Sequence, residues 1–242
     1  MTLQHWLQDR ILDGLQIRQL ELAGLGIRTI STAAFEAVSR HLEVLRLHDN
    51  RLESLPQGAF RTLLHLGQLQ LHNNRLTQLS SGTFIGLTNL LHLTLNENRI
   101  SSVDRDTWFA TPKLVMLALE DNRLGDGRLL FPDSALLYLE ELRLDRNHLG
   151  AIDDDIISGL PNLRRLYFRS NGVEMVPSNA FAVVPRLEML DLSANNLSQL
   201  PAAAFNGKRP PSHFESVLEP GLRITGHRVN DFGRVWSSHG LV

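Results

Sequence analysis

The sequence predicts an α/β solenoid whose concave side carries a parallel β-sheet and whose convex side is mostly irregular. The first observation is a repeat with a spacing of 24 or 25 residues, marked by one aliphatic position: Ile17, Leu42, Leu66, Leu90, Leu114, Leu139, Leu163 and Leu187. The second is an alternation with a period of two, in which Leu45 and Leu47 face one side and Arg46 the other. Each unit should therefore form one short strand, and successive strands should stack in parallel about 4.8 Å apart.

The composition is that of a folded chain with a substantial core. The chain has 242 residues, 43% of them hydrophobic, which suits one large domain or one elongated repeat array. A formal net charge of -2 provides no global field for nucleic acid or for an anionic membrane. The sequence contains no cysteine, which excludes a disulfide framework, a thiolate metal site and a cysteine nucleophile.

The first residues, "MTLQHWLQDRILDGLQ", contain polar residues throughout and no continuous apolar stretch, so they do not resemble a signal peptide. No stretch of the sequence approaches the roughly 20 apolar residues that a membrane-spanning helix needs. We therefore expect no direct insertion of this chain into a membrane.

Each unit has two recognisable halves. The first half follows LxxLxLxxNxL, from "LEVLRLHDNRL" at Leu42 to "LEMLDLSANNL" at Leu187, although Leu25 replaces the Asn in the first unit. The second half is exemplified by "ESLPQGAF" and "SQLPAAAF". Its aromatic column contains Phe35, Phe60, Phe84, Trp108, Phe181 and Phe205, with Ile157 in the same column and Pro132 in place of Phe in one unit. We interpret this column as a stacked spine of the core on the convex side.

Together these motifs resemble the leucine-rich repeat family, in particular its 24-residue class with LPxxxFxxL. The resemblance covers residues 17 to about 207. It implies a right-handed horseshoe and a non-enzymatic protein-binding module, as in Toll-like receptors, Slit, chaoptin-like adhesion proteins and small leucine-rich proteoglycans. These relatives place the chain outside the cell or at its surface, as part of a receptor, adhesion or matrix protein.

The domain organisation follows from the extent of the repeats. We expect an N-terminal capping segment at 1–16, a repeat array of about eight units at 17–207 and a non-repeat tail at 208–242. Within the tail only "LRITGHRV" is expected to form a strand, because Pro210 and Pro211 oppose regular structure.

The two ends of the array need covering. At the N-terminal end, the first turn is expected to be covered by Leu3, Trp6, Leu7 and Leu12. No cap is recognisable at the C-terminal end of the array. The secreted relatives usually have cysteine-rich caps, and none can form here. We therefore expect the chain to be a fragment or splice form of a longer repeat protein. The uncapped C-terminal end of the array is a candidate for self-association.

An asparagine recurs where each strand must turn away. Its side-chain amide can pair with backbone donors and acceptors at once, which predicts a structural ladder. The ladder comprises Asn50, Asn74, Asn98, Asn122, Asn147, Asn171 and Asn195.

The variable positions of the concave face are the candidates for ligand binding. They comprise an imidazole-rich patch with His48, His72 and His92, an acidic patch with Glu97, Glu120 and Asp121, and a basic and aromatic patch with Arg143, Arg146, Arg164, Arg165, Tyr167 and Arg169, and they include Arg46. Arg and Tyr commonly anchor protein interfaces. The alternative is that these arginines pair with Glu140, Glu141 and Asp145 across neighbouring strands and only solvate the face.

The sequence offers little for metals or catalysis. His48 and His72 fall on adjacent strands, but a zinc site normally needs four ligands and only His92 is nearby in the pattern; solvated histidines or a pH-sensitive contact are the simpler interpretations. The run Asp153 to Asp155 and "DNRLGDG" lack the pattern of an EF-hand. No GxSxG, HExxH or phosphate-binding glycine loop is present, so we expect neither a cofactor nor an enzyme.

The sequence is compatible with two cellular locations. The LPxxxFxxL half-repeat favours an extracellular protein, and "NLS" at Asn196 is a glycosylation sequon. The absence of a signal peptide and of cysteines favours a cytoplasmic scaffold or regulatory subunit. In both cases the expected partner is a protein and not a nucleic acid.

Overall fold

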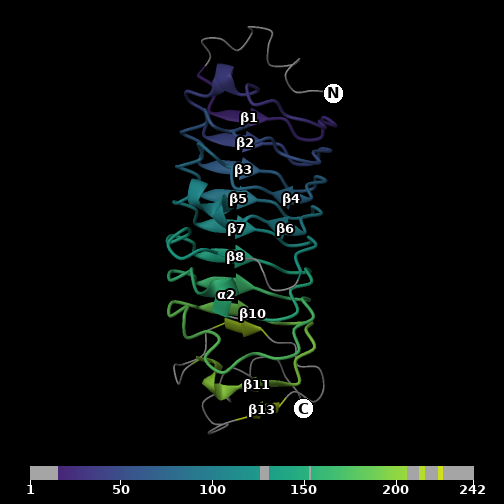
Figure 1. Ribbon diagram of the computed structural model, residues 1–242, viewed down its shortest axis with the longest axis vertical. Helices are drawn as coiled ribbons and strands as arrows, with labels where there is room; N and C mark the ends of the chain where they lie inside the picture. The colour runs from purple at the N-terminus through teal and green to yellow at the C-terminus, as the bar shows by residue number, and fades with distance from the viewer. Residues whose placement is uncertain (1–15, 126–130, 153, 206–212, 216–222, 226–242) are drawn as a thin grey trace.

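The computed structural model describes residues 16–125, 131–152, 154–205, 213–215 and 223–225, and within these ranges the chain is a solenoid (Figure 1). Successive turns stack along the long axis and each contributes one short strand to a parallel sheet. The predicted fold class is confirmed. The described strands of this main sheet, in order, are β1 (Gln19–Glu21), β2 (Val44–Arg46), β3 (Gln68–Gln70), β5 (His92–Thr94), β7 (Met116–Ala118), β8 (Glu141–Arg143), β9 (Arg165–Tyr167), β10 (Met189–Asp191) and β12 (His213–Glu215).

The rest of each turn consists mainly of turns and short helices. Two small parallel sheets, β4 with β6 and β11 with β13, lie apart from the main sheet. The elements are η1 (Glu36–Val38), β4 (Gln78–Leu79), β6 (Ser102–Val103), η2 (Arg105–Ala110), α2 (Asp154–Ile157), β11 (Gln199–Pro201), η3 (Ala202–Phe205) and β13 (Arg223–Thr225), where η denotes a 3-10 helix.

The core is a continuous stack of the central strand residues. Leu45 pairs in register with Leu69, and Leu69 with Leu93, and all three are fully buried. Their strand neighbours point the other way and stay partly exposed, as the period of two requires. Because one turn cannot bury its own leucines, neighbouring turns supply the apolar cover, which is worth about 1.5–3 kcal/mol for each buried side chain.

A second stack of rings runs through the core. Ring centroids lie 5.9 Å apart in the pair Phe35–Phe60 and 5.2 Å apart in the pair Phe181–Phe205. The expectation that Pro132 takes the place of Phe in this column is wrong, because Phe131 is buried and its ring centroid lies 5.7 Å from that of Trp108. A one-residue slip of the loop places the larger apolar ring in the core, where its burial stabilises the fold more than a proline would.

The asparagines make the hydrogen bonds that the turns need. Asn122 is typical: its Nδ2 donates to the carbonyls of Leu95 and Leu119 at 3.0 Å each, and its Oδ1 accepts from the Ile100 N–H at 2.9 Å. The residue before each ladder asparagine lies in the left-handed region. These residues are Asp49, Asn73, Glu97, Asp121, Arg146, Ser170 and Ala194, with φ between 51° and 57°.

The ends of the chain differ in part from expectation. The predicted N-terminal cap, Leu3 to Leu12, lies outside the described residues. In the tail, β13 lies within "LRITGHRV" as expected, but β12 was not predicted: it pairs in parallel with β10 and adds a further strand to the main sheet. Backbone pairing in register can continue after the side-chain pattern fades, because it depends on the preceding strand edge. The division at residues 16 and 207 stays a prediction.

Candidate functional site

The exposed face of the main sheet, which we call the concave face, carries the variable side chains in columns. The pairing aligns one column of outward positions across the strands: Glu21, Arg46, Gln70, Thr94, Ala118, Arg143, Tyr167 and Asp191. A second aligned column contains Gln19, Val44, Gln68, His92, Met116, Glu141, Arg165 and Met189. The sheet therefore brings together residues that are 24 or 25 positions apart in sequence.

Glu141 is the centre of the basic and aromatic patch. Glu141 is 8% exposed, and its carboxylate accepts hydrogen bonds from Arg143 Nε at 2.5 Å and Arg165 Nε at 2.7 Å. Burial alone would raise the pKa of the Glu141 carboxyl, but the bonds from the two arginines outweigh it and hold this pKa below its ordinary value. Glu141 is thus a buried carboxylate held between two cations.

Arg143 also connects this group to its neighbours. Its guanidinium carbon lies 5.2 Å from the centre of the Tyr167 ring, and its Nη1 lies 4.0 Å from Glu120 Oε1. We call Glu120, Glu141, Arg143, Arg165 and Tyr167 the central network.

The other arginines are mostly paired as well. Arg146 forms a two-point ion pair with Asp121, with both N–O distances at 2.6 Å, and Arg164 pairs with Glu188 and lies 3.7 Å from Glu140. In the described part of the chain the Arg169 guanidinium has no partner, although the Arg169 backbone N–H donates to Asp145 Oδ1 at 2.7 Å. The pairing of arginines with acidic neighbours, which the sequence left as an alternative, is therefore what the structure shows for most of the patch.

The acidic patch is divided between two rows. Glu97 and Asp121 are residues that precede ladder asparagines, whereas Glu120 belongs to the central network through Arg143. Glu120 Oε2 is buried and, among the described residues, accepts no hydrogen bond. Burial raises the pKa of the Glu120 carboxyl, and burial also raises that of Asp145.

The imidazole patch is a stacked pair. The rings of His48 and His72 lie 4.4 Å apart with an angle of 9° between their planes. His48 Nδ1 lies 2.7 Å from Asp49 Oδ2, and His72 Nδ1 lies 3.1 Å from Thr94 Oγ1. Burial, followed by the charge of His48, lowers the pKa of His72, while the bond from His48 is the main cause that lowers the pKa of Asp49.

His92 does not join this pair. It aligns with Gln68, four residues before His72, which corresponds to about 13 Å along the strand direction. Among the described residues, no group of three or more His, Cys, Asp or Glu side chains could hold a metal ion. Within the same ranges, no helix combines the length and apolar character needed to cross a membrane.

Sequence reasoning missed the role of Glu141, which it named only as a potential partner of arginines. The available signal was the alternating "EELRL", in which Glu141 and Arg143 share one side of a strand. The row of left-handed residues was also missed. Its signal was the position directly before each ladder asparagine, which is polar in every full unit until Ala194.

Comparison with known proteins finds relatives that match a part of this chain. Leucine-rich repeat-containing protein 3B of Danio rerio is 41% identical over 104 residues, which make up 40% of this chain and 38% of that protein. Leucine-rich repeat-containing protein 3C of Homo sapiens is 51% identical over 51 residues, or 21% of this chain and 18% of that protein. The matched part of the chain thus spans well under half the length of these relatives.

Solved structures share the fold. The TLR13–ssRNA13 complex superposes with a TM-score of 0.80 and 20% identity, covering 94% of this chain and 31% of the TLR13 chain, which shows the fold alone. Human 5T4 (Wnt-activated inhibitory factor 1, Trophoblast glycoprotein) superposes with a TM-score of 0.68 and 25% identity, covering 82% of this chain and 75% of the 5T4 chain. The family model described as "Leucine rich repeat" matches residues 40–90, 65–124 and 138–207. The chain therefore belongs to the leucine-rich repeat family.

Proposed function

We propose that this chain is a non-enzymatic protein-binding module whose concave face contacts a protein ligand, within a cell-surface receptor, adhesion or matrix protein. The observation that supports this most is the central network, in which a buried carboxylate binds two arginines and one of these arginines lies over a tyrosine ring. Candidate contact residues along the face also include Arg46, His48, His72, Glu97, Asp121, Arg146 and Arg169.

The central network has the chemistry of an interface anchor. Arg143 and Arg165 keep 43% and 42% of their side-chain surface exposed, although the Nε of each is bound to Glu141. In the described part of the chain neither Nη of Arg165 has a hydrogen-bond partner, so these N–H groups can donate to a ligand carboxylate or carbonyl. Side chains that are already ordered lose little conformational entropy on binding, which favours affinity.

The charge of the central network favours a protein over a nucleic acid. Two arginines are offset by Glu141 and Glu120, so the network lacks the excess positive charge that phosphate backbones attract. The TLR13 structure contains single-stranded RNA, but the paired arginines of this chain support a mixed, nearly neutral protein surface as the ligand.

The chain's two tyrosines provide a matched experiment. A panel of purified human ectodomains would be screened by biolayer interferometry against the wild type, Tyr167→Ala and Tyr138→Ala. Tyr138 is 61% exposed and lies outside the concave columns, so its loss controls for removal of an aromatic ring. We expect Tyr167→Ala to weaken a saturable interaction at least about 30-fold, as for an interface hot spot, and Tyr138→Ala to leave it unchanged. Equal binding by all three proteins would show that the central network is not the contact.

The alternative is an intracellular scaffold or regulatory subunit. Three features support the extracellular proposal: the LPxxxFxxL half-repeat, the likeness to a protein named Trophoblast glycoprotein and the exposed sequon residue Asn196. The genomic reading frame upstream of Met1 separates the two. A signal sequence or a cysteine-rich cap would support the extracellular parent, whereas a clean intracellular start would contradict it.

A further inference from the structure

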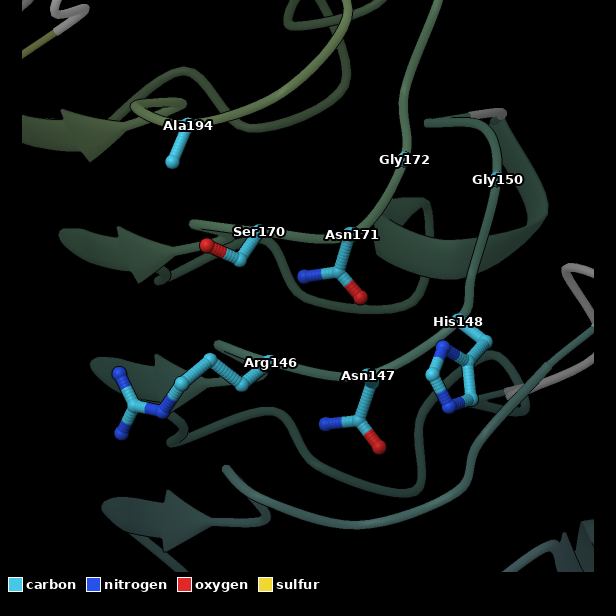
Figure 2. Close-up of a pocket in the computed structure, with 8 residues that line it drawn as sticks. All are labelled: Arg146, Asn147, His148, Gly150, Ser170, Asn171, Gly172 and Ala194. Carbon is cyan, nitrogen blue, oxygen red and sulfur yellow. The ribbon is translucent and has the colours of Figure 1, made fainter.

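A hollow of about 580 Å³ lies between the turn at Asn147 and the turn at Asn171 (Figure 2). Figure 2 shows the side-chain oxygen of Asn171 directed into the space between these two turns. The hollow lies beside the concave face, because Arg146 and Ser170 follow the ends of β8 and β9.

The asparagine ladder is interrupted at this hollow. In the preceding turn, the Leu124 N–H donates to Asn147 Oδ1 at 3.0 Å and the His148 N–H donates to the Leu124 carbonyl at 2.7 Å. The corresponding donor to Asn171 Oδ1 would be the Leu149 N–H, but among the described residues Asn171 Oδ1 accepts no bond although Asn171 is only 2% exposed.

The chain has shifted its hydrogen bonds by one residue. The Gly150 N–H donates to the backbone carbonyl of Asn171 at 3.0 Å, and the Leu149 carbonyl accepts from the Ala151 N–H at 2.7 Å. The Gly172 N–H, whose equivalents donate to the preceding turn, has no acceptor in the described ranges. An acceptor and a donor that pair elsewhere in the solenoid are therefore both unpaired at this place.

Two glycines explain why the hollow is open. Gly150 and Gly172 have φ of 70° and 73°, and a Cβ added at either would meet nothing within 4 Å. The position of Gly172 holds a long side chain in the preceding full units, namely Arg51, Arg75, Arg99, Arg123 and His148. The space that a side chain can cover in those units is uncovered here.

The lining selects a neutral group that both donates and accepts. A ligand must donate to Asn171 Oδ1, since a buried acceptor without a donor is costly. None of the described residues that line the hollow is acidic, which disfavours an ammonium group or a metal ion. Nε and Nη2 of Arg146 are already bound to Asp121, which disfavours an anion.

We propose that the hollow binds an amide of the protein ligand, with an amide N–H donating to Asn171 Oδ1 and an amide carbonyl of the ligand accepting from the Gly172 N–H. The identification of the ligand as a protein rests on the proposed function. An Asn or Gln side chain can make both bonds with one amide, because one N–H of a primary amide lies on the same side as its carbonyl. In the main chain the N–H and the carbonyl of one trans peptide point in opposite directions, so two neighbouring peptide groups would share the bonds. The experiment below separates these sources.

The test is a titration of the 15N-labelled chain by NMR. Acetamide stands for a side-chain amide and N-methylacetamide for a main-chain amide, while methyl acetate is a control of similar size without an N–H. We expect saturable shifts of the Gly150 and Gly172 amide signals with at least one amide and none with methyl acetate. Tighter binding of acetamide assigns the side-chain source, and tighter binding of N-methylacetamide assigns the main chain.

Variants locate the binding in the hollow. Ala194→Trp should fill the hollow and weaken amide binding at least 10-fold. Its φ of 53° is shared with Arg146 and is close to that of Glu97, so this backbone carries large side chains. Asn73→Trp, the same position in a distant turn, should bind like the wild type. Asn171→Ala removes the acceptor and should also abolish binding, which covers the case that Ala194→Trp does not fold.

Some results would overturn the proposal. If neither amide shifts these signals saturably, the hollow holds water only. If methyl acetate binds as well as the amides, or if both Ala194→Trp and Asn171→Ala keep binding in folded protein, the hydrogen-bonding assignment is wrong. Small amides do not require Tyr167, so Tyr167→Ala should bind them normally, and failure here is distinguishable from failure of the proposed concave-face function.

Discussion

Replacing Asn122 or Asn171 with alanine measures how much of the solenoid's stability resides in its ladder. Both side chains are almost fully buried, at 5% and 2% exposed. Asn122 makes four side-chain hydrogen bonds, three from Nδ2 and one accepted by Oδ1 from the Ile100 N–H. Asn171 makes two, from Nδ2 to the carbonyls of Leu144 and Arg169.

The difference in cost follows from what each truncation leaves behind. After Asn122→Ala, the Leu95 carbonyl keeps its bond from Asn98 at 2.9 Å and the Leu119 carbonyl keeps its bond from Asn147 at 3.0 Å. The Ile100 N–H, however, loses its acceptor. That orphaned donor costs about 1–3 kcal/mol and each of the three other lost bonds about 0.5–1.5 kcal/mol, so we expect a loss of about 2.5–7.5 kcal/mol in the free energy of unfolding.

Asn171→Ala should cost about 1–2 kcal/mol, because no backbone N–H depends on its Oδ1 and the change removes an unpaired buried oxygen. Urea unfolding followed by circular dichroism at pH 7 would compare the two variants with Asn196→Ala. The Asn196 side chain is exposed and has no partner among the described residues, so this control should change stability by less than about 0.5 kcal/mol.

Hydrogen exchange of the Ile100 amide adds a local measurement, which matters because repeat arrays can unfold in parts. Protection of this amide should fall in Asn122→Ala and stay unchanged in Asn171→Ala. If Asn171→Ala destabilised the chain as much as Asn122→Ala, Asn171 Oδ1 would have a partner after all. The interpretation of the interrupted ladder would then be refuted.

Two further predictions concern Glu120 and Asn196. Burial raises the pKa of Glu120 in the folded state. The ionised Glu120 carboxylate therefore destabilises the folded chain, and this destabilisation grows as the pH rises from the pKa of the unfolded state through the raised pKa of the folded state. Glu120→Gln should therefore increase the free energy of unfolding more at pH 7 than at pH 3.5, as urea unfolding at both pH values would show; equal changes would contradict the burial argument. If the parent protein is secreted, Asn196 should carry an N-glycan after expression through the secretory pathway of mammalian cells. The glycan would be detected as a mass shift that peptide N-glycosidase removes, and Asn196→Gln should lack this shift. An unmodified wild type would count against the extracellular proposal.

The core and the site were predictable to different degrees. Leu45, Leu69 and the ladder asparagines could be assigned from spacing alone, because each unit repeats the same contacts with its neighbours. The columns of the concave face followed from the same register. The exchange of Pro132 for Phe131 could not be predicted, since a loop of altered length can slip by one residue to bury the larger ring.

Side-chain pairing across the face was beyond the repeat pattern. The sequence placed Glu141 and Arg165 on neighbouring strands but could not show that one buried carboxylate would bind both Arg143 and Arg165. The sequence also shows a glycine beside Asn171. It does not reveal the shift of hydrogen bonds that leaves the side-chain oxygen of Asn171 unpaired among the described residues.

The periodic leucines and asparagines thus specified the solenoid, because one rise per turn and one buried face per strand admit a single way of stacking. What depended on the folded chain was the choice among several near partners: which carboxylate holds which arginine, which ring fills the spine and where the ladder is interrupted. Those choices are decided by distances of a few ångströms between residues from different turns, which only the assembled stack brings together.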